Sequence, residues 1–206
     1  MDKSAGNCIY FVDHDDTLAR GIFEAVSTVL DLPEIKESPV RDQALENPES
    51  FIKRYISNLN GVSSDQIAEI GSKLIPNDEV IKYVREASLI DGNSLYILTE
   101  NPLTEYIFRD TGGLGLNLNG IYATFPLEMY KGRLVVPKGA KYTPKTDIAR
   151  QILHGTDSSS TYGKACIITD GGGLDKQLEP HLIENGFPKI HKRSEIGHVK
   201  IIYLSR

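Results

Sequence analysis

Short apolar runs alternate with helical patterns along the chain. The three clearest runs are CIYFVD (8–13), SLYILT (94–99) and ACIITD (165–170). Apolar residues at nearly every position are typical of a strand that is covered on both faces. A further strand is predicted at 198–205, a weaker one at 188–192 and an extended segment at 120–125. This alternation predicts an α/β fold with a Rossmann-like parallel sheet and helices on both of its faces.

The stretch between the first two runs has the periodicity of helices. Apolar residues recur at the spacing of one helix face in GIFEAVSTVLDL (21–32) and in FIKRYISNL (51–59). SSDQIAEIGSKLI (63–75) begins with a serine that can cap a helix. PNDEVIKYVREA (76–87) predicts a helix that runs directly into the strand at 94–99.

These patterns divide the chain into two expected units. Its 206 residues are enough for one hydrophobic core with an elaboration. We expect residues 1–20 and 76–206 to form the α/β core. Residues 21–75 are expected to form a mostly helical cap, inserted after the first strand.

Polar residues end the three clearest apolar runs. These residues are Asp13, Thr99 and Asp170. Ligands bind at the carboxyl ends of the strands in open α/β sheets, so neighbouring strands would bring the three side chains to one crevice. Clustered carboxylates tolerate one another when a divalent cation neutralises them, and Mg²⁺ takes one or two carboxylates together with a substrate phosphate.

Four motifs resemble those of the haloacid dehalogenase superfamily, most of whose members are phosphatases. DHDDT (13–17) resembles the DxDxT signature, and Thr99 after an apolar run resembles the second motif. Lys145 resembles the third motif and TDGGGLD (169–175) the fourth. The segment 120–153, with a Gly-Arg-Leu turn in an expected β-hairpin, is similar to the phosphoserine-phosphatase-like branch.

The resemblance implies a two-step hydrolysis with defined residue roles. Asp13 would attack phosphorus and form an aspartyl-phosphate, and Asp15 would act as general acid and then base. Thr99 would donate a hydrogen bond to the phosphoryl group, and Lys145 would place positive charge on its oxygens. The expected catalytic residues are Asp13, Asp15, Thr99 and Lys145, and the expected substrate-binding residues are His14, Asp15, Thr99, Glu100 and Lys145.

The same resemblance implies Mg²⁺ as the cofactor. Its expected ligands are Asp13, Asp15 through the backbone carbonyl, and Asp170, with Asp175 contacting a metal-bound water or orienting Lys145. A competing assignment of the third motif remains open within the sequence, because Lys141 lies only four residues before Lys145.

Composition argues against two classes of partner, nucleic acids and membranes. The net charge of −5 argues against a nucleic-acid partner, which would be bound through released counterions. No stretch approaches the roughly 20 apolar residues of a membrane-spanning helix, and no secretory signal is recognised at the start. Cys8 and Cys166 lie in or beside apolar runs, as expected of buried thiols in a reducing compartment. We expect a cytoplasmic protein that acts on a small phosphorylated metabolite, with no nucleic-acid or membrane partner.

These features together predict a Mg²⁺-dependent phosphatase of small phosphomonoesters. One alternative is a phosphomutase or phosphotransferase that uses the same aspartyl-phosphate. Another is a catalytically silent binding protein that has kept the fold.

Overall fold

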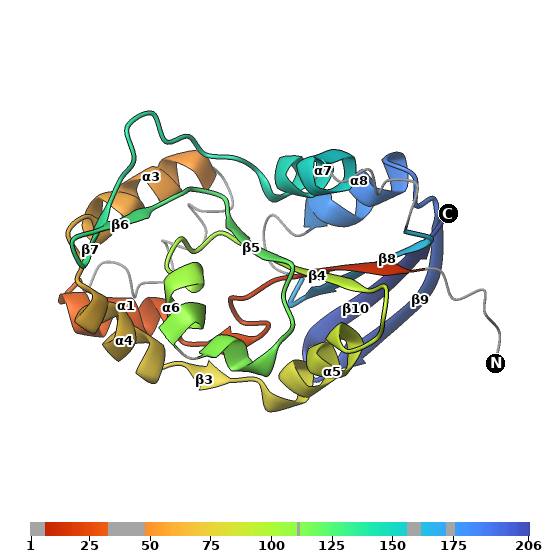
Figure 1. The fold of residues 1–206 in the computed structure, drawn as a ribbon, viewed down its shortest axis with the longest axis horizontal. Helices are drawn as coiled ribbons and strands as arrows, with labels where there is room; N and C mark the ends of the chain where they lie inside the picture. The colour runs from red at the N-terminus through yellow and green to blue at the C-terminus, as the bar shows by residue number, and fades with distance from the viewer. Residues whose placement is uncertain (1–6, 33–47, 111, 156–161, 172–175) are drawn as a thin grey trace.

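The centre of the molecule is a six-stranded sheet with the strand order β5-β4-β1-β8-β10-β9. The computed structural model describes residues 7–32, 48–110, 112–155, 162–171 and 176–206 (Figure 1). The strands are β1 (Cys8–Val12), β4 (Ser94–Thr99), β5 (Gly120–Ala123), β8 (Lys164–Thr169), β9 (Lys189–Ile196) and β10 (Val199–Ser205). The predicted α/β fold is therefore confirmed.

The sheet is mostly parallel. β1 pairs in parallel with both β4 and β8, and β4 pairs in parallel with β5. The register places Val12 of β1 beside Ile97 of β4 and Ile168 of β8. β10 runs antiparallel to both β8 and β9, an orientation that the apolar pattern of residues 198–205 did not predict.

Helices cover both faces of the sheet (Figure 1). They are α5 (Asp78–Ser88) on one face, and α7 (Lys145–Gly155) and α8 (Leu178–Glu184) on the other. Successive residues of a strand point to opposite faces. Tyr10 of β1 accordingly belongs to the core cluster that contains Val84 of α5. Its neighbour Phe11 belongs to the cluster that contains Ile148 of α7 and Leu182 of α8.

A third hydrophobic cluster is built mainly from the stretch between β1 and β4. Its helices are α1 (Ile22–Leu30), α3 (Pro48–Leu59) and α4 (Ser64–Ser72). Val26, Leu59 and Ile70 from these helices are fully buried, and Tyr106 of α6 (Thr104–Asp110) joins them. α4 begins with a complete capping box between Ser63 and Gln66, the serine cap that the sequence predicted.

Two very short strands join this helical stretch to the sheet. β2 (Ala19–Arg20) pairs antiparallel with β3 (Ile75–Pro76). Just beyond them, the backbone N–H of Asn77 donates to the carbonyl of Leu18 at 2.9 Å. The two ends of the helical stretch therefore lie side by side at the end of the loop that follows β1.

The expected hairpin is present as β6 (Glu128–Tyr130) and β7 (Arg133–Val135), and it packs on the helical stretch. Its turn contains Gly132 with a φ of 74°, a backbone conformation that favours glycine. The backbone N–H of Gly61 donates to Leu134, and that of Leu134 donates to Val62, each at 2.8 Å. The hairpin is thus hydrogen-bonded to the loop between α3 and α4.

One predicted boundary is wrong. The helix at 76–87 was expected to run directly into the strand at 94–99, but α5 ends at Ser88 and a turn over 89–93 precedes β4. The Asn93 side chain fills this turn, donating to the carbonyl of Ala87 at 2.9 Å and accepting from the N–H of Cys8 at 3.1 Å. No helix among the described residues is long and apolar enough to cross a bilayer.

Candidate active site

The three strands whose ends carry polar residues are neighbours in the sheet. β1 lies between β4 and β8, so Asp13, Thr99 and Asp170 are all delivered to the same edge. The backbone N–H of Asp13 donates to the carbonyl of Ile168 at 2.9 Å, which continues the β1–β8 ladder into the loop. Asp13 is 7% exposed and Thr99 is completely buried. This edge of the sheet is therefore the candidate site.

Lys145 is the closest cation to the Asp13 carboxylate that the structure records. Its Nζ donates to Asp13 Oδ1 at 2.8 Å, and the Lys145 side chain is only 2% exposed. Lys145 is the first residue of α7, and the start of this helix places its ammonium beside Asp13, the residue that follows β1. The competing Lys141 is exposed on the preceding loop.

Glu100 makes a second ion pair with the same lysine. Its Oε2 lies 2.7 Å from Lys145 Nζ, and its side chain is 28% exposed. The buried ammonium is therefore shared between two carboxylates. Glu100 was expected among the substrate-binding residues, and its carboxylate faces the lysine expected to bind phosphate.

The loop after β1 is a tight turn closed on its own backbone. The carbonyl of His14 accepts from the N–H of Leu18 at 2.8 Å, and Asp16 adopts a φ of 58°. A left-handed φ is tolerated by aspartate better than by most residues, because its short polar side chain bonds locally. The completely buried Thr17 fastens the turn to β8, since its Oγ1 accepts from the N–H of Asp170 at 2.9 Å.

Side-chain hydrogen bonds hold the Asp15 carboxylate on both of its oxygens. Oδ1 lies 2.7 Å from Nδ1 of the buried His14, within hydrogen-bond distance. Oδ2 accepts from the hydroxyl of Thr99 at 3.4 Å. Thr104 contacts both partners, with its Oγ1 3.2 Å from Thr99 Oγ1 and 3.4 Å from His14 Nδ1. Three predicted residues thus meet through Asp15.

Sequence reasoning assigned no role to several residues that support this arrangement. Thr17 is the threonine of the DxDxT motif and could have been recognised there. The backbone N–H of Asn101 donates to Thr99 Oγ1 at 2.9 Å, and its side-chain oxygen accepts from the N–H of Leu103, also at 2.9 Å. The only signal in the sequence was the Asn-Pro pair after the strand, which is typical of a turn.

Tyr55 brings the helical stretch close to the site. Its hydroxyl accepts from Asn101 Nδ2 at 3.5 Å. Burial, and to a smaller extent the negative charge of Asp15, raise the pKa of the Tyr55 hydroxyl well above its ordinary value. Through this contact with Asn101, whose N–H bonds Thr99, α3 reaches the residues that support the site.

The donor groups at this edge are hard oxygen atoms. Asp13 and Asp170 supply two carboxylates, and the loop after β1 supplies backbone carbonyls. Oxygen donors of this kind are those that Mg²⁺ takes. No cluster of three or more His, Cys, Asp or Glu side chains suited to a metal occurs in the part of the chain that the structure describes. Asp175, the fourth expected metal-site residue, lies outside the described residues.

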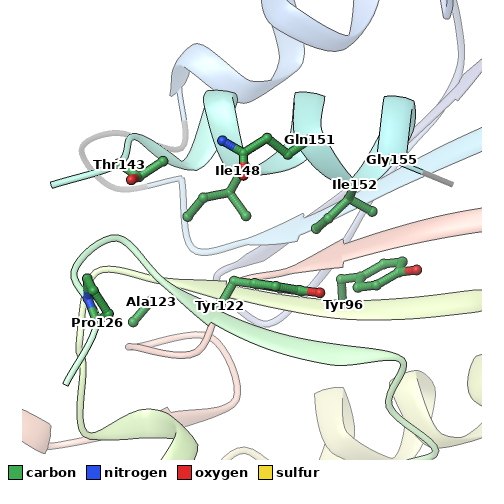
Figure 2. Close-up of a pocket in the computed structure, with 9 residues that line it drawn as sticks. All are labelled: Tyr96, Tyr122, Ala123, Pro126, Thr143, Ile148, Gln151, Ile152 and Gly155. Atoms are coloured by element: carbon green, nitrogen blue, oxygen red, sulfur yellow. The ribbon is translucent and has the colours of Figure 1, made fainter. Parts of the chain in front are cut away.

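A groove of about 490 Å³ lies away from these carboxylates, between β4 and β5 on one side and α7 on the other (Figure 2). Figure 2 shows Tyr96 and Tyr122 facing Ile148 and Ile152 across it, and the two tyrosine rings are 6.3 Å apart. Its described lining residues include none of the expected catalytic residues. The groove is therefore separate from the candidate site.

Comparison with known proteins identifies the fold. No protein-family model and no curated protein sequence matches the chain. A phosphoserine phosphatase solved as a phospho-aspartyl intermediate analogue superposes with a TM-score of 0.57 and 14% identity, over 85% of this chain and 83% of that chain. The phosphoserine phosphatase from T. onnurineus in complex with NDSB-201 gives a TM-score of 0.50 and 13% identity, over 74% and 73% of the two chains. The chain therefore has the haloacid-dehalogenase-like fold that its four motifs predicted.

Proposed function

We propose that the chain is a Mg²⁺-dependent phosphatase that hydrolyses a small phosphomonoester through an aspartyl-phosphate on Asp13. The observation that carries this proposal is the buried contact of 2.8 Å between Lys145 Nζ and Asp13 Oδ1. A nucleophilic carboxylate and a phosphoryl group repel each other, and a fixed ammonium beside the carboxylate reduces that repulsion. The solved phosphatase that was captured as a phospho-aspartyl analogue supports this chemistry by its fold.

The first step forms a bond between an Asp13 carboxylate oxygen and phosphorus. The bond from phosphorus to the ester oxygen breaks, and Asp15 gives its proton to the departing alcohol. In the second step water attacks phosphorus, Asp15 takes a proton from it, and the Asp13 oxygen leaves. The contacts of Asp15 with His14 and Thr99 support this role, because a general acid works only when its carboxyl is held in place.

Thr99 and Lys145 are the proposed phosphoryl-binding side chains, joined by the backbone of His14 in the loop. The Asn101 N–H fixes the position of the Thr99 oxygen, and the hydroxyl hydrogen, which Asp15 accepts in the structure, would turn to the phosphoryl group. Lys145 stabilises the negative charge that spreads over the phosphoryl oxygens in the transition state. Glu100 remains a proposed substrate-binding residue, because its carboxylate contacts Lys145, the lysine proposed to bind the phosphoryl group.

Mg²⁺ would be held by the carboxylates of Asp13 and Asp170 and by the backbone carbonyl of Asp15, with Asp175 as a further candidate. When bound, it supplies positive charge that lets two anions approach each other. We further propose that residues 21–75 act as a cap that reads the substrate and limits the access of water.

The test is hydrolysis of p-nitrophenyl phosphate with and without Mg²⁺, followed by a panel of phosphorylated metabolites. Asp13→Asn should lower turnover by on the order of 10³-fold or more, as expected when a nucleophile is removed. Asp91→Asn is the matched control, because Asp91 is exposed in the turn before β4, at the far end of that strand from Thr99. Turnover that persists in Asp13→Asn would refute the mechanism. Transfer of labelled phosphate to an acceptor other than water would identify a mutase instead.

A further inference from the structure

Lys145 holds a second carboxylate that the proposed reaction does not use. Its Nζ lies 2.7 Å from Glu100 Oε2 and 2.8 Å from Asp13 Oδ1. The proposed nucleophile must stay beside the lysine throughout the reaction. The carboxylate that can give way when a phosphoryl group arrives is therefore Glu100.

Solvent exposure also distinguishes Glu100 from Lys145 and Asp13. Lys145 is 2% exposed and Asp13 is 7% exposed, whereas the Glu100 side chain is 28% exposed. Glu100 also lies in the bend that immediately follows β4, outside regular structure. Glu100 Oε1 is itself buried, but the side chain as a whole is more exposed than that of Asp13 and can exchange its contact with Lys145 for water at a lower cost in desolvation.

The negative charge of Glu100 should oppose the binding of anions at the site. In the described part of the site, four expected residues carry carboxyl groups (Asp13, Asp15, Glu100 and Asp170) and Lys145 carries one ammonium, so negative charge predominates. Two of the four, Asp13 and Glu100, contact the lysine that would bind phosphate, and only Asp13 is the proposed nucleophile. An added phosphate dianion has to approach this negative charge and share its lysine.

We propose that Glu100 competes with phosphate for Lys145 and so weakens the affinity of the site for the free phosphate product. This inference rests on the proposed function, since it takes Lys145 as the phosphate-binding lysine. When phosphate departs, the Glu100 carboxylate returns to Lys145 and keeps the buried ammonium paired. This exchange favours the release of phosphate over its rebinding. Glu100 is thus a specificity-determining residue that limits product inhibition.

Glu100→Gln separates charge from shape, because glutamine keeps the length of the side chain and one acceptor oxygen. Inorganic phosphate is titrated calorimetrically into the wild type and the variant, both with Mg²⁺ and in metal-free buffer. The variant should bind phosphate about tenfold more tightly, a difference of about 1.4 kcal/mol, because the charge that competes for Lys145 is gone. A gain in affinity cannot arise from misfolding.

Glu86→Gln is the matched control, since Glu86 is exposed in the last turn of α5 and loses the same charge. Its phosphate affinity should stay within about twofold of the wild type. Lys145→Met should weaken phosphate binding whether Glu100 is present or replaced. Equal or weaker phosphate binding by Glu100→Gln, including no measurable binding by either protein, overturns the inference and makes Glu100 a residue that orients Lys145.

These outcomes are independent of turnover. If Glu100→Gln binds phosphate more tightly but the wild type hydrolyses no phosphomonoester, the competition stands and the proposed phosphatase activity falls. If turnover depends on Asp13 but phosphate affinity does not change in Glu100→Gln, the proposed function stands and the competition falls.

Discussion

Replacing Lys145 with methionine should destabilise the fold, although it removes a charge from the interior. Methionine fills a similar volume, but Asp13, at 7% exposure, then remains buried without this ammonium. Removing one partner of a buried ion pair leaves the other charge uncompensated, which costs more than the pair itself contributes.

The size of the effect follows from the two contacts of the lysine. At an effective dielectric constant of about 20, each contact of about 3 Å corresponds to on the order of 5 kcal/mol of attraction. Desolvation offsets most of this, and breaking a buried pair costs about 3–5 kcal/mol. Glu100 is 28% exposed and can turn toward water. We therefore take the lower end, a loss of about 3 kcal/mol in the free energy of unfolding.

Urea unfolding at neutral pH in metal-free buffer measures this loss. With a slope of about 2 kcal/mol per molar urea, the midpoint should fall by about 1.5 M. Asp13→Asn/Lys145→Met should recover part of the loss, because the variant no longer buries an unpaired carboxylate at position 13. A Lys145→Met midpoint equal to that of the wild type, or a double variant no more stable than Lys145→Met, would refute the reasoning.

Three further predictions concern the supports of the site and the core. Thr17→Val removes the acceptor of the Asp170 N–H, 2.9 Å away, and should lower the free energy of unfolding by about 1–2 kcal/mol, whereas Thr17→Ser keeps the acceptor and should recover most of it in thermal unfolding. Ser63→Ala removes the cap of α4 and should cost about 1 kcal/mol in urea unfolding; an unchanged midpoint would show that the capping box does not stabilise the fold. Burial and then the charge of Arg150 lower the pKa of His181 below its ordinary value of 6.5, so the folded chain binds this proton less readily than the unfolded chain. Stability should fall as the pH drops below that value, and His181→Gln should flatten the fall in urea midpoints between about pH 7.5 and pH 5.5; equal slopes would contradict the assignment.

The parts of the fold that sequence predicts well are those with strong apolar patterns. β1, β4 and β8 are buried on both faces, so their residues form continuous apolar runs. β9 is the opposite case, an edge strand with mostly exposed residues that include Lys189 and Arg193. Charged residues protect such an edge from pairing with other chains, and they also weaken the apolar pattern, so that only a weak strand over 188–192 could be predicted there. The strands β2 and β3 have only two residues each and carry no pattern.

The candidate site also has a part that the sequence predicts and a part that depends on packing. Residues at strand ends, such as Asp13 and Thr99, could be named because the chain alone shows where an apolar run stops. The contact between Glu100 and Lys145 joins residues 45 positions apart, and it depends on how α7 packs against β4. The contact of His14 with Phe108, whose ring is 5.4 Å from the imidazole, likewise joins residues far apart in the sequence and could not be predicted from it.

The pairing of Ala19 with Pro76 and of Arg20 with Ile75 gives the long helical stretch a narrow neck. A segment whose entrance and exit are adjacent can be lengthened, shortened or exchanged without redirecting the chain on either side. The entropy of closing such a segment rises only slowly with its length. The loop after β1 stays anchored meanwhile, because the backbone N–H of Asn77 donates to the carbonyl of Leu18 next to the neck. The architecture therefore allows the helical stretch to change in length or sequence without displacing the loop that carries Asp13 and Asp15.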